Sequence, residues 1–252
     1  MRALDAVLTL ERPLLVALDV DGTLAPIVRD PDAAVIPPGT IKTLETLARS
    51  PTATVALITG RDSKSLSRME RLEGIWRGVE HGGVVLAPGE LPSDRVLPEA
   101  QQEALDRFRI WTEEHGTEAW IEHKPGAIAV HVRALAETAP DRAEALLAEV
   151  EAFATSLGLH VRKGRSVREA EASRHDKGQA LREIFARSRA RSVFFAGDDL
   201  TDVPAIEFAS ANGVGAFVSS AERPRSPSAA AITIAGTEEL ATLLDSLSRE
   251  LD

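Results

Sequence analysis

Short runs of consecutive apolar residues, each followed at once by polar or glycine residues, constrain the fold of this chain more than any other feature. The runs are residues 14–18, 55–58, 193–196 and 214–218. Stretches with helical periodicity, such as residues 40–48, separate them. Continuous apolar strands joined by helices are typical of a parallel sheet covered on both faces. We therefore predict an α/β fold with a Rossmann-like core, in which the polar clusters after the strands meet at one edge of the sheet.

Residues 101–173 follow a different pattern, which indicates an inserted domain. Two amphipathic helices are each followed by two strands with alternating polar and apolar residues. The predicted order is helix, strand, strand, helix, strand, strand, an α+β unit (αββαββ). We expect a discontinuous core of residues 1–100 and 174–252, with residues 101–173 as a cap. The expected elements are helices at 99–114 and 141–157 and strands at 118–124, 127–133, 159–163 and 166–171.

The charge balance excludes several classes of partner. The chain has 29 Lys and Arg residues against 39 Asp and Glu residues, a net charge of −10. Nucleic acids and anionic membrane surfaces attract clustered cations, so we expect no nucleic acid and no membrane as a partner. The charge does not forbid a small anionic substrate, because a metal and a few placed cations could hold one locally. The absence of cysteine excludes disulfides, zinc–thiolate sites and thiol nucleophiles.

No apolar stretch reaches the roughly 18 residues of a transmembrane helix. Charged residues at positions 5, 11 and 12 interrupt the N-terminal segment, so we expect no signal peptide. These features favour a cytoplasmic protein. They leave the oligomeric state open, with a monomer favoured.

The first polar cluster, Asp19-Val20-Asp21-Gly22-Thr23, follows the first apolar run. Two carboxylates two residues apart can share one hard cation and still take different roles. Asp19 would attack phosphorus, and Asp21 would donate a proton to the leaving oxygen. The alternative is a strand end with an Asx turn and no chemistry.

The cluster at residues 197–202, Gly-Asp-Asp-Leu-Thr-Asp, follows the third apolar run. Adjacent carboxylates at a strand end repel each other unless a cation lies between them. Mg²⁺ prefers oxygen ligands, so Asp198, Asp199 and Asp202 indicate a magnesium site. The alternative is that they cap the following helix, residues 203–209.

Two further features suit a phosphate group. Lys177 precedes a predicted helix at 179–187 and could neutralise a transferring phosphoryl group. Thr59, Gly60 and Arg61 follow the second apolar run, where a hydroxyl and free amides suit phosphate oxygens. The alternatives are a solvated surface lysine and an ordinary strand-to-helix turn.

These four clusters, in this order, resemble the haloacid dehalogenase (HAD) superfamily, which consists mostly of Mg²⁺-dependent phosphatases with an aspartate nucleophile. The likeness extends over nearly the whole chain and is closest to the trehalose-6-phosphate phosphatase family. The matching segments are LDVDGTLAPIV (18–28), ITGRD (58–62), EHGG (80–83), IEHKPGAIAVHVR (121–133), REAEASRHDKGQAL (168–181) and GDDLTD (197–202).

The resemblance implies a role for each core motif. Asp19 is the nucleophile, and Asp21 is the acid and base. Thr59 and Lys177 hold phosphate. The implied Mg²⁺ ligands are Asp19, the main-chain carbonyl of Asp21 and Asp198, with Asp199 and Asp202 orienting them. The implied reaction is hydrolysis of a phosphorylated disaccharide, most closely trehalose 6-phosphate, through an aspartyl-phosphate.

Members of this family bind the sugar hydroxyls with residues of the cap. Glu122, Lys124 and Glu169 match those positions, and His131 and Arg133 lie in the matching segment. Alternation along a strand places Glu122 and Lys124 on one face, and it would place His131 and Arg133 together on the partner strand. The alternative is an ordinary solvated face of an antiparallel sheet.

Two departures from the family pattern concern the sugar. The family has an Arg-Pro pair where this chain has Glu171-Ala172, and an aromatic residue where it has Val132. The sequence therefore leaves open a phosphatase for another sugar or pseudo-disaccharide phosphate. It also leaves open a phosphomutase and a sugar-phosphate sensor without turnover, although a sensor has no need of the Asp19 and Asp21 pair.

Overall fold

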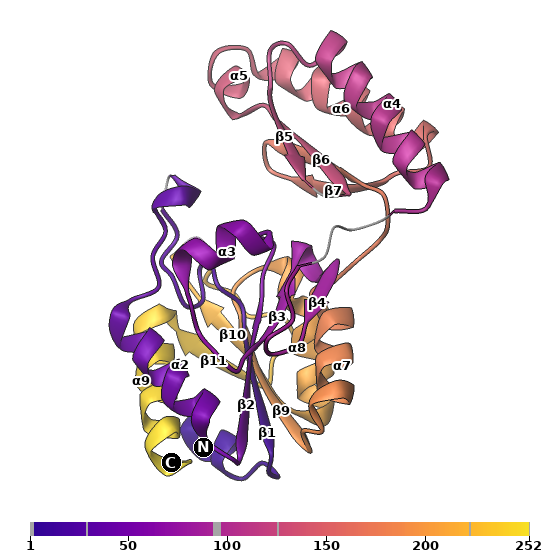
Figure 1. Cartoon of the computed structure of the whole chain (residues 1–252). Helices are drawn as coiled ribbons and strands as arrows, with labels where there is room; N and C mark the ends of the chain where they lie inside the picture. The colour runs from indigo at the N-terminus through magenta and orange to yellow at the C-terminus, as the bar shows by residue number, and fades with distance from the viewer. Residues whose placement is uncertain (1–2, 29, 93–96, 125, 222, 252) are drawn as a thin grey trace. The chain divides into compact units, whose positions relative to one another are not determined.

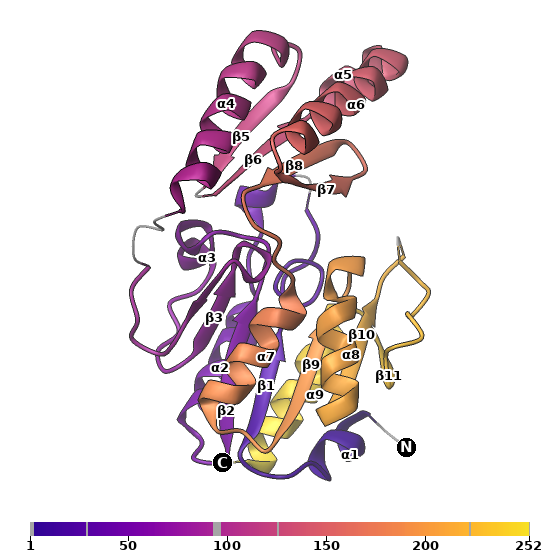
Figure 2. The ribbon, with the colours of Figure 1, turned by 90° about the vertical axis from the view of Figure 1, so that its right-hand side faces the viewer.

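The computed structural model describes residues 3–28, 30–92, 97–124, 126–221 and 223–251. The chain forms two compact units, Met1–Pro92 with His175–Asp252, and Ser93–Arg174. Figures 1 and 2 show both units in two orientations. Among the described helices, none combines the length and the apolar character needed to cross a membrane.

The first unit is built on a seven-stranded sheet with the strand order β11-β10-β9-β1-β2-β3-β4. Every neighbouring pair is parallel except β3 and β4, which are antiparallel. The four apolar runs of the sequence are β1, β2, β9 and β10, which are neighbours in the centre of the sheet. The strands are β1 (Leu14–Leu18), β2 (Ala53–Ile58), β3 (Trp76–Val79), β4 (Val84–Leu86), β9 (Ser192–Gly197), β10 (Gly213–Ser219) and β11 (Ile232–Ala235).

Helices cover both faces of this sheet, as Figure 1 shows, with α2 and α9 on one side and α7 and α8 on the other. Leu14, Val16 and Leu18 of β1 belong to one apolar cluster, whereas Leu15 and Ala17 belong to the other. Burial on both faces explains the continuous apolar runs and confirms the predicted α/β fold. The helices of this unit are α1 (Ala3–Leu8), α2 (Pro38–Arg49), α3 (Ser63–Met69), α7 (Lys177–Ser188), α8 (Val203–Asn212) and α9 (Gly236–Glu250), with short 3₁₀ turns η1 (Pro31–Ala33), η2 (Glu80–Gly82) and η3 (Leu200–Asp202).

The second unit is a four-stranded antiparallel sheet with the order β5-β6-β8-β7. One face of this sheet packs on α4 and α6 through apolar side chains such as Ile128, Val130 and Ala170. The elements are α4 (Glu99–His115), β5 (Trp120–Lys124), β6 (Ala127–His131), α5 (Arg133–Thr138), α6 (Pro140–Ser156), β7 (His160–Gly164) and β8 (Val167–Glu171).

The strand predicted to extend to residue 133 ends instead at His131, so the prediction that Arg133 shares a strand face with His131 was wrong, while its predicted role in substrate binding stays a prediction. Val132 has a ψ of 19°, and its carbonyl oxygen accepts a hydrogen bond from the backbone amide of Ala136. This bond starts α5, a helix that the alternating pattern concealed. Arg133 is therefore the first, exposed residue of α5 and does not share a strand face with His131.

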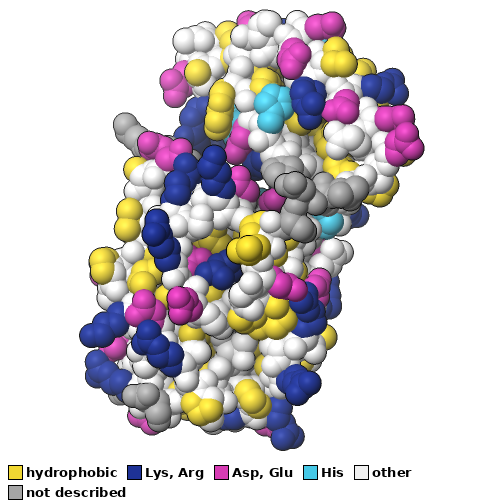
Figure 3. Space-filling model, viewed as in Figure 1, with side chains coloured by type: hydrophobic (Ala, Val, Ile, Leu, Met, Phe, Trp, Pro, Cys, Tyr) yellow, Lys and Arg dark blue, Asp and Glu magenta, His cyan; other side chains and the backbone are white. Residues whose placement is uncertain are grey.

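Charges of both signs are mixed on the face of the molecule shown in Figure 3, where acidic side chains lie among the basic ones.

Candidate active site

Asp19 lies directly after β1, at the carboxyl edge in the middle of the sheet. Its backbone amide donates to the carbonyl of Ala196 at 2.9 Å, which extends the pairing with β9 by one residue. The residue is only 3% exposed. Lys177 Nζ lies 2.6 Å from its Oδ1, and the Thr23 hydroxyl donates to its Oδ2 over a longer 3.3 Å. A buried carboxylate at a strand end, held by one ammonium, is the centre of the site.

Lys177 is the first residue of α7, and its ammonium bridges two carboxylates. The side chain of Asp176 caps the helix by accepting from the backbone amide of Gln179 at 2.7 Å. Lys177 Nζ lies 2.7 Å from Oδ1 of Asp202 and 2.6 Å from Oδ1 of Asp19. Burial disfavours the ammonium, but these two carboxylates outweigh it and raise the pKa of Lys177. The lysine is therefore a permanent cation.

The loop after β9 is held in shape by Asp202, which is fully buried. Its Oδ2 accepts from the backbone amides of Asp198 at 3.0 Å and Asp199 at 2.9 Å. Asp199 and Asp202 together form a capping box on the short turn η3, whereas α8, the helix that the alternative interpretation had them cap, has no side-chain cap among the described residues. A Cβ on Gly197 would lie 2.4 Å from Cγ of Asp202, which explains the glycine before the two aspartates.

Asp198 reaches over the loop that follows β1. Gly22 has a φ of +84°, and a Cβ there would lie 2.3 Å from Oδ2 of Asp198. Any side chain at position 22 would therefore push Asp198 away from Asp19 and Asp21. The glycine of the Asp-Val-Asp-Gly-Thr motif allows the two loops to approach.

One carboxylate oxygen each from Asp19, Asp198 and Asp202 lies within 4.8 Å of the others, and all three residues are buried. Burial and then the charge of Asp202 raise the pKa of Asp19 well above its ordinary value, despite the opposing effect of Lys177. Burial and Asp202 likewise raise the pKa of Asp198, to about 6. Oxygen donors in this arrangement fit a hard divalent cation such as Mg²⁺.

The hydrogen bonds divide these carboxylates into two kinds. Both oxygens of Asp202 accept hydrogen bonds of 2.7–3.0 Å, from Lys177 and from two backbone amides. Oδ2 of Asp19, by contrast, accepts only the longer 3.3 Å bond from Thr23 among the residues that the structure describes. Asp202 therefore shapes the site, and Asp19 and Asp198 are the carboxylates best placed to bind a cation.

Asp21 is held by a fork of two hydrogen bonds from Arg61, with 2.7 Å from Nε to Oδ2 and 2.6 Å from Nη2 to Oδ1. Its side chain is 41% exposed, whereas that of Arg61 is 10% exposed. The sequence predicted that Arg61 binds phosphate, and that role stays a prediction. What the structure adds is that Arg61 orients the predicted acid and base.

Thr59 and Gly60 lie at the end of β2, beside the turn η2. Thr59 is 1% exposed, and its hydroxyl accepts from the backbone amide of Arg61 at 3.1 Å. Its carbonyl accepts from the backbone amide of His81 at 2.9 Å. The His81 ring lies against Gly60, where a Cβ would be 2.4 Å from Nε2. The second strand end is thus fixed by a turn some twenty residues further along the chain.

In the second unit, the sheet face opposite the helices carries a network of charged side chains. The register places Glu122 beside Ala129 and Ala129 beside Glu169, so all three share this face. Lys124 Nζ lies 2.7 Å from Glu169 and 3.9 Å from Glu122. The alanine in the central strand leaves room for the lysine to extend between β5 and β8.

His131 completes this network, with Nε2 3.1 Å from a carboxylate oxygen of Glu122. This hydrogen bond is the main reason that the pKa of Glu122 is lowered. Burial disfavours the Lys124 ammonium, but Glu169 and Glu122 outweigh it and raise the pKa of Lys124. The predicted sugar-binding residues other than Arg133 therefore form one connected, charged group.

The comparisons with known proteins agree with this geometry. The trehalose-phosphatase family model matches residues 17–238. The chain belongs to the trehalose-phosphatase family. A trehalose-phosphate phosphatase of Mycobacterium marinum is 33% identical over 225 residues, which cover 84% of this chain and 55% of that protein. A trehalose-phosphate phosphatase of Mycobacterium tuberculosis is 30% identical and covers 94% of this chain and 61% of that protein.

Solved structures show the same fold. The C-terminal domain of the trehalose-6-phosphate phosphatase of C. albicans has a TM-score of 0.74 at 20% identity, covering 98% of this chain and 95% of that domain. A haloacid dehalogenase-like hydrolase from Bacteroides thetaiotaomicron has a TM-score of 0.68 at 17% identity, and the match covers 92% of this chain and 98% of that one. The chain thus covers these structures almost fully, but it spans only about a sixth to three fifths of the curated relatives.

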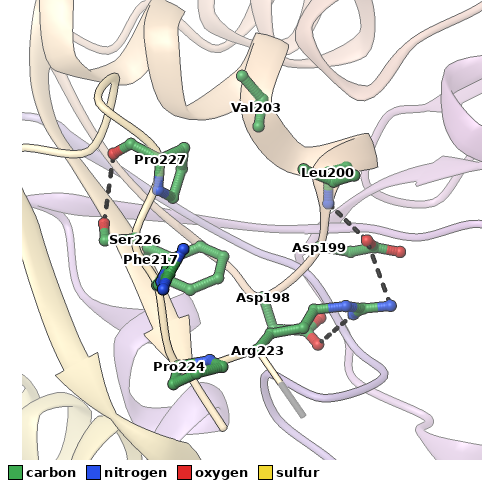
Figure 4. Close-up of a pocket in the computed structure, with 10 residues that line it drawn as sticks. Asp198, Asp199, Leu200, Val203, Phe217, Arg223, Pro224, Ser226 and Pro227 are labelled. Carbon is green, nitrogen blue, oxygen red and sulfur yellow. Dashed lines mark hydrogen bonds and ion pairs between the residues drawn. The ribbon is translucent and has the colours of Figure 1, made fainter.

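One residue at the centre of this trehalose-phosphatase family site was missed by the sequence analysis. Arg223, in the loop between β10 and β11, forms ion pairs with Asp198 at 2.9 Å and Asp199 at 3.3 Å. Figure 4 shows its guanidinium beside both carboxylates. They border a cavity of about 550 Å³ that is also lined by Leu200, Val203, Phe217, Pro224, Arg225, Ser226 and Pro227. Nothing in the sequence of this loop links it to Asp198.

The family-matching segment at 80–83 forms the turn η2, but its residues were not among the predicted site residues. Glu80 and His81 both have a φ of 54°, the left-handed region that non-glycine residues rarely adopt. The backbone amide of Glu80 donates to the carbonyl of Arg61 at 2.9 Å. The His-Gly-Gly sequence at 81–83 was the available signal, because glycines after a strand indicate a turn with positive φ.

One of the departures from the family pattern, Glu171, contributes to the charged face of the second unit. Glu171 lies on the charged face of the second unit, and Arg162 Nε donates to its carboxylate at 2.8 Å. Burial outweighs this arginine and raises the pKa of Glu171.

Trp120 lies on the same face, 64% exposed, with its ring centroid 4.4 Å from that of His131.

Proposed function

We propose that this chain is a phosphatase that hydrolyses a phosphorylated disaccharide, with trehalose 6-phosphate as the first candidate. The observation that carries the proposal is the buried Asp19 carboxylate at the end of β1, with Lys177 on one oxygen and Asp198 beside it. Membership of the trehalose-phosphatase family supports the substrate class.

In the proposed first step, Asp19 attacks phosphorus and forms an aspartyl-phosphate, while the bond from phosphorus to the sugar oxygen breaks. Lys177 holds Oδ1 of Asp19 at 2.6 Å, whereas Thr23 reaches Oδ2 only at 3.3 Å, so Oδ2 is the more weakly held oxygen and the proposed attacking one. The Lys177 ammonium and the Thr59 hydroxyl would stabilise negative charge on the phosphoryl oxygens. Asp21 gives its proton to the departing sugar oxygen, and to carry that proton it releases one of the two hydrogen bonds from Arg61.

In the second step, Asp21 takes a proton from water as that water attacks phosphorus. The bond between phosphorus and Asp19 breaks, so inorganic phosphate leaves and the Asp19 carboxylate is restored. Asp21 is protonated again at the end, and the cycle balances. The one side chain acts first as acid and then as base, which suits its half-exposed position.

Asp19, Asp198 and the main-chain carbonyl of Asp21 would hold Mg²⁺, with Asp199 and Asp202 keeping the loop in place. When bound, Mg²⁺ would withdraw negative charge from the phosphoryl oxygens and help to align the phosphate. The clustering of buried carboxylate oxygens supports this choice of metal.

We propose that the charged face of the second unit binds the sugar through Glu122, Lys124, His131 and Glu169. Carboxylates accept hydrogen bonds from sugar hydroxyls, and the lysine can donate to them. A phosphatase for another disaccharide phosphate is the second candidate, because Glu171 and Arg162 add a carboxylate and a guanidinium to this face.

Phosphate release from a panel of esters tests the proposal. The panel contains trehalose 6-phosphate, other disaccharide phosphates, glucose 6-phosphate and p-nitrophenyl phosphate, each with and without Mg²⁺. We expect the highest kcat/KM for a disaccharide phosphate, and no release by the Asp19→Asn variant. Isomerised sugar phosphate without free phosphate would indicate a mutase, and binding without any turnover would indicate a sensor.

A further inference from the structure

Arg223 neutralises a buried carboxylate that the proposed function assigns to Mg²⁺. Its Nη1 is 2.9 Å from Oδ2 of Asp198, and its Nη2 is 3.3 Å from Oδ1 of Asp199. Asp198 is 1% exposed, and the aspartate Asp202 lies beside it. A positive charge at this position is therefore required whenever the carboxylate of Asp198 is ionised and no metal is bound.

The oxygen that Arg223 engages faces the loop that carries the other predicted metal ligands. A Cβ on Gly22 would lie 2.3 Å from Oδ2 of Asp198 and 2.7 Å from its Oδ1. Gly22 directly follows Asp21, whose carbonyl is a predicted ligand. A cation held jointly by this loop and Asp198 would therefore approach the side of the carboxylate that Arg223 occupies.

The Arg223 side chain is also able to leave. It is 39% exposed and borders the cavity of about 550 Å³. Its backbone is fixed by hydrogen bonds in both directions with Ser220, at 3.1 and 3.2 Å. The side chain can thus swing into solvent without moving the loop once another cation neutralises Asp198.

We propose that Arg223 is a displaceable counter-ion, which occupies Asp198 until Mg²⁺ takes its place and thereby lowers the affinity of the site for Mg²⁺. The inference rests on the proposed function, since it takes Mg²⁺ as the ligand of Asp198. Two effects act in the same direction. The arginine gives up a hydrogen bond when the metal binds, and its remaining positive charge repels the metal.

The opposite role is that Arg223 orients Asp198 for the metal, as partners behind metal ligands commonly do. The two roles differ in sign. Removal of a competitor tightens Mg²⁺ binding, whereas removal of an orienting residue weakens it.

Calorimetric titration of MgCl₂ into the metal-free full chain decides between them. The variants are Arg223→Gln and, as a matched control, Arg225→Gln. Arg225 lines the same cavity two residues further along, is exposed, and forms no ion pair with any other residue that the structure describes. We expect Arg223→Gln to bind Mg²⁺ about tenfold more tightly than the wild type, about 1.4 kcal/mol. Arg225→Gln should stay within about twofold.

A second variant guards against misfolding. Arg223→Lys keeps one positive charge but loses the fork that reaches both carboxylates, so its affinity should rise by only about two- to threefold. Thermal melting in EDTA checks that each variant is folded before titration.

Mg²⁺ binding by Arg223→Gln that is unchanged or weaker, with the wild type binding normally, would overturn this inference and leave the proposed function intact. A wild-type chain that binds no Mg²⁺ would overturn the metal assignment itself. The titration measures binding without turnover, so it separates these two failures.

Discussion

The buried carboxyl of Asp198 should make the metal-free protein less stable as the pH rises. Its pKa is raised from the ordinary 3.8 to about 6, by burial first and then by Asp202, with Arg223 opposing. A raised folded-state pKa means that the native state holds the proton more tightly than the unfolded chain. The stabilisation is complete below pH 3.8 and is lost as the pH rises through 6.

The magnitude follows from the size of the shift. From 3.8 to about 6 is roughly two units. Each unit corresponds to about 1.4 kcal/mol, so the free energy of unfolding should fall by about 3 kcal/mol in all, most of it between pH 4 and pH 7. Asp198→Asn removes the titrating group and should remove this part of the pH dependence.

Urea denaturation in EDTA, followed by circular dichroism at several pH values from 4 to 7.5, measures the effect. The difference between wild type and Asp198→Asn cancels the titrating groups that do not interact with Asp198. We expect the variant to gain about 3 kcal/mol relative to the wild type over this range. Mg²⁺ should reverse the trend for the wild type, because it binds the ionised carboxylate. A difference that stays flat with pH, or that favours the wild type at pH 7, would refute the reasoning.

Three further predictions concern activity and packing. Asp19→Asn should keep the fold by circular dichroism and lose at least about a thousandfold in turnover, roughly 4 kcal/mol, because an amide is a poor nucleophile; a tenth of the wild-type rate would show that another group attacks. Glu169→Ala should lower kcat/KM about ten- to a hundredfold for trehalose 6-phosphate but much less for p-nitrophenyl phosphate, which offers no sugar hydroxyls. Equal losses on both substrates would indicate a folding defect instead. Gly60→Ala should cost about 1–3 kcal/mol in urea denaturation, because the new Cβ would meet the His81 ring at 2.4 Å. Gly39→Ala, with nothing within 4 Å of its Cβ, is the matched control and should cost far less.

Much of the core could be predicted from local pattern. Continuous apolar runs indicate strands buried on both faces, and parallel strands end at a common edge. That reasoning placed Asp19, Thr59 and Asp198 at one edge of the sheet, and in the structure they follow β1, β2 and β9. The spacing of carboxylates within each motif then indicated a hard cation, since oxygen chemistry depends on residue type rather than on the fold.

The pattern failed where a local hydrogen bond competed with it. Residues 127–133 alternate like a strand, but the carbonyl of Val132 starts α5 and removes Arg133 from the face of His131. Alternation records which side chains are buried, and Val132 is buried although it begins a helix rather than continuing the strand. Sequence periodicity alone could not distinguish the two.

What only the tertiary structure decided is which charges meet. Lys177 and Asp19 are 158 residues apart in the chain and 2.6 Å apart in space. Arg61 on Asp21 and Arg223 on Asp198 are pairings of the same kind, between loops from different strands. A chain with 29 Lys and Arg residues offers many partners for each carboxylate. Backbone packing, such as the close approach of Gly22 to Asp198, decides which loops meet and therefore which partner each carboxylate has. Burial then requires that pairing, because an unpaired charge in the interior is costly.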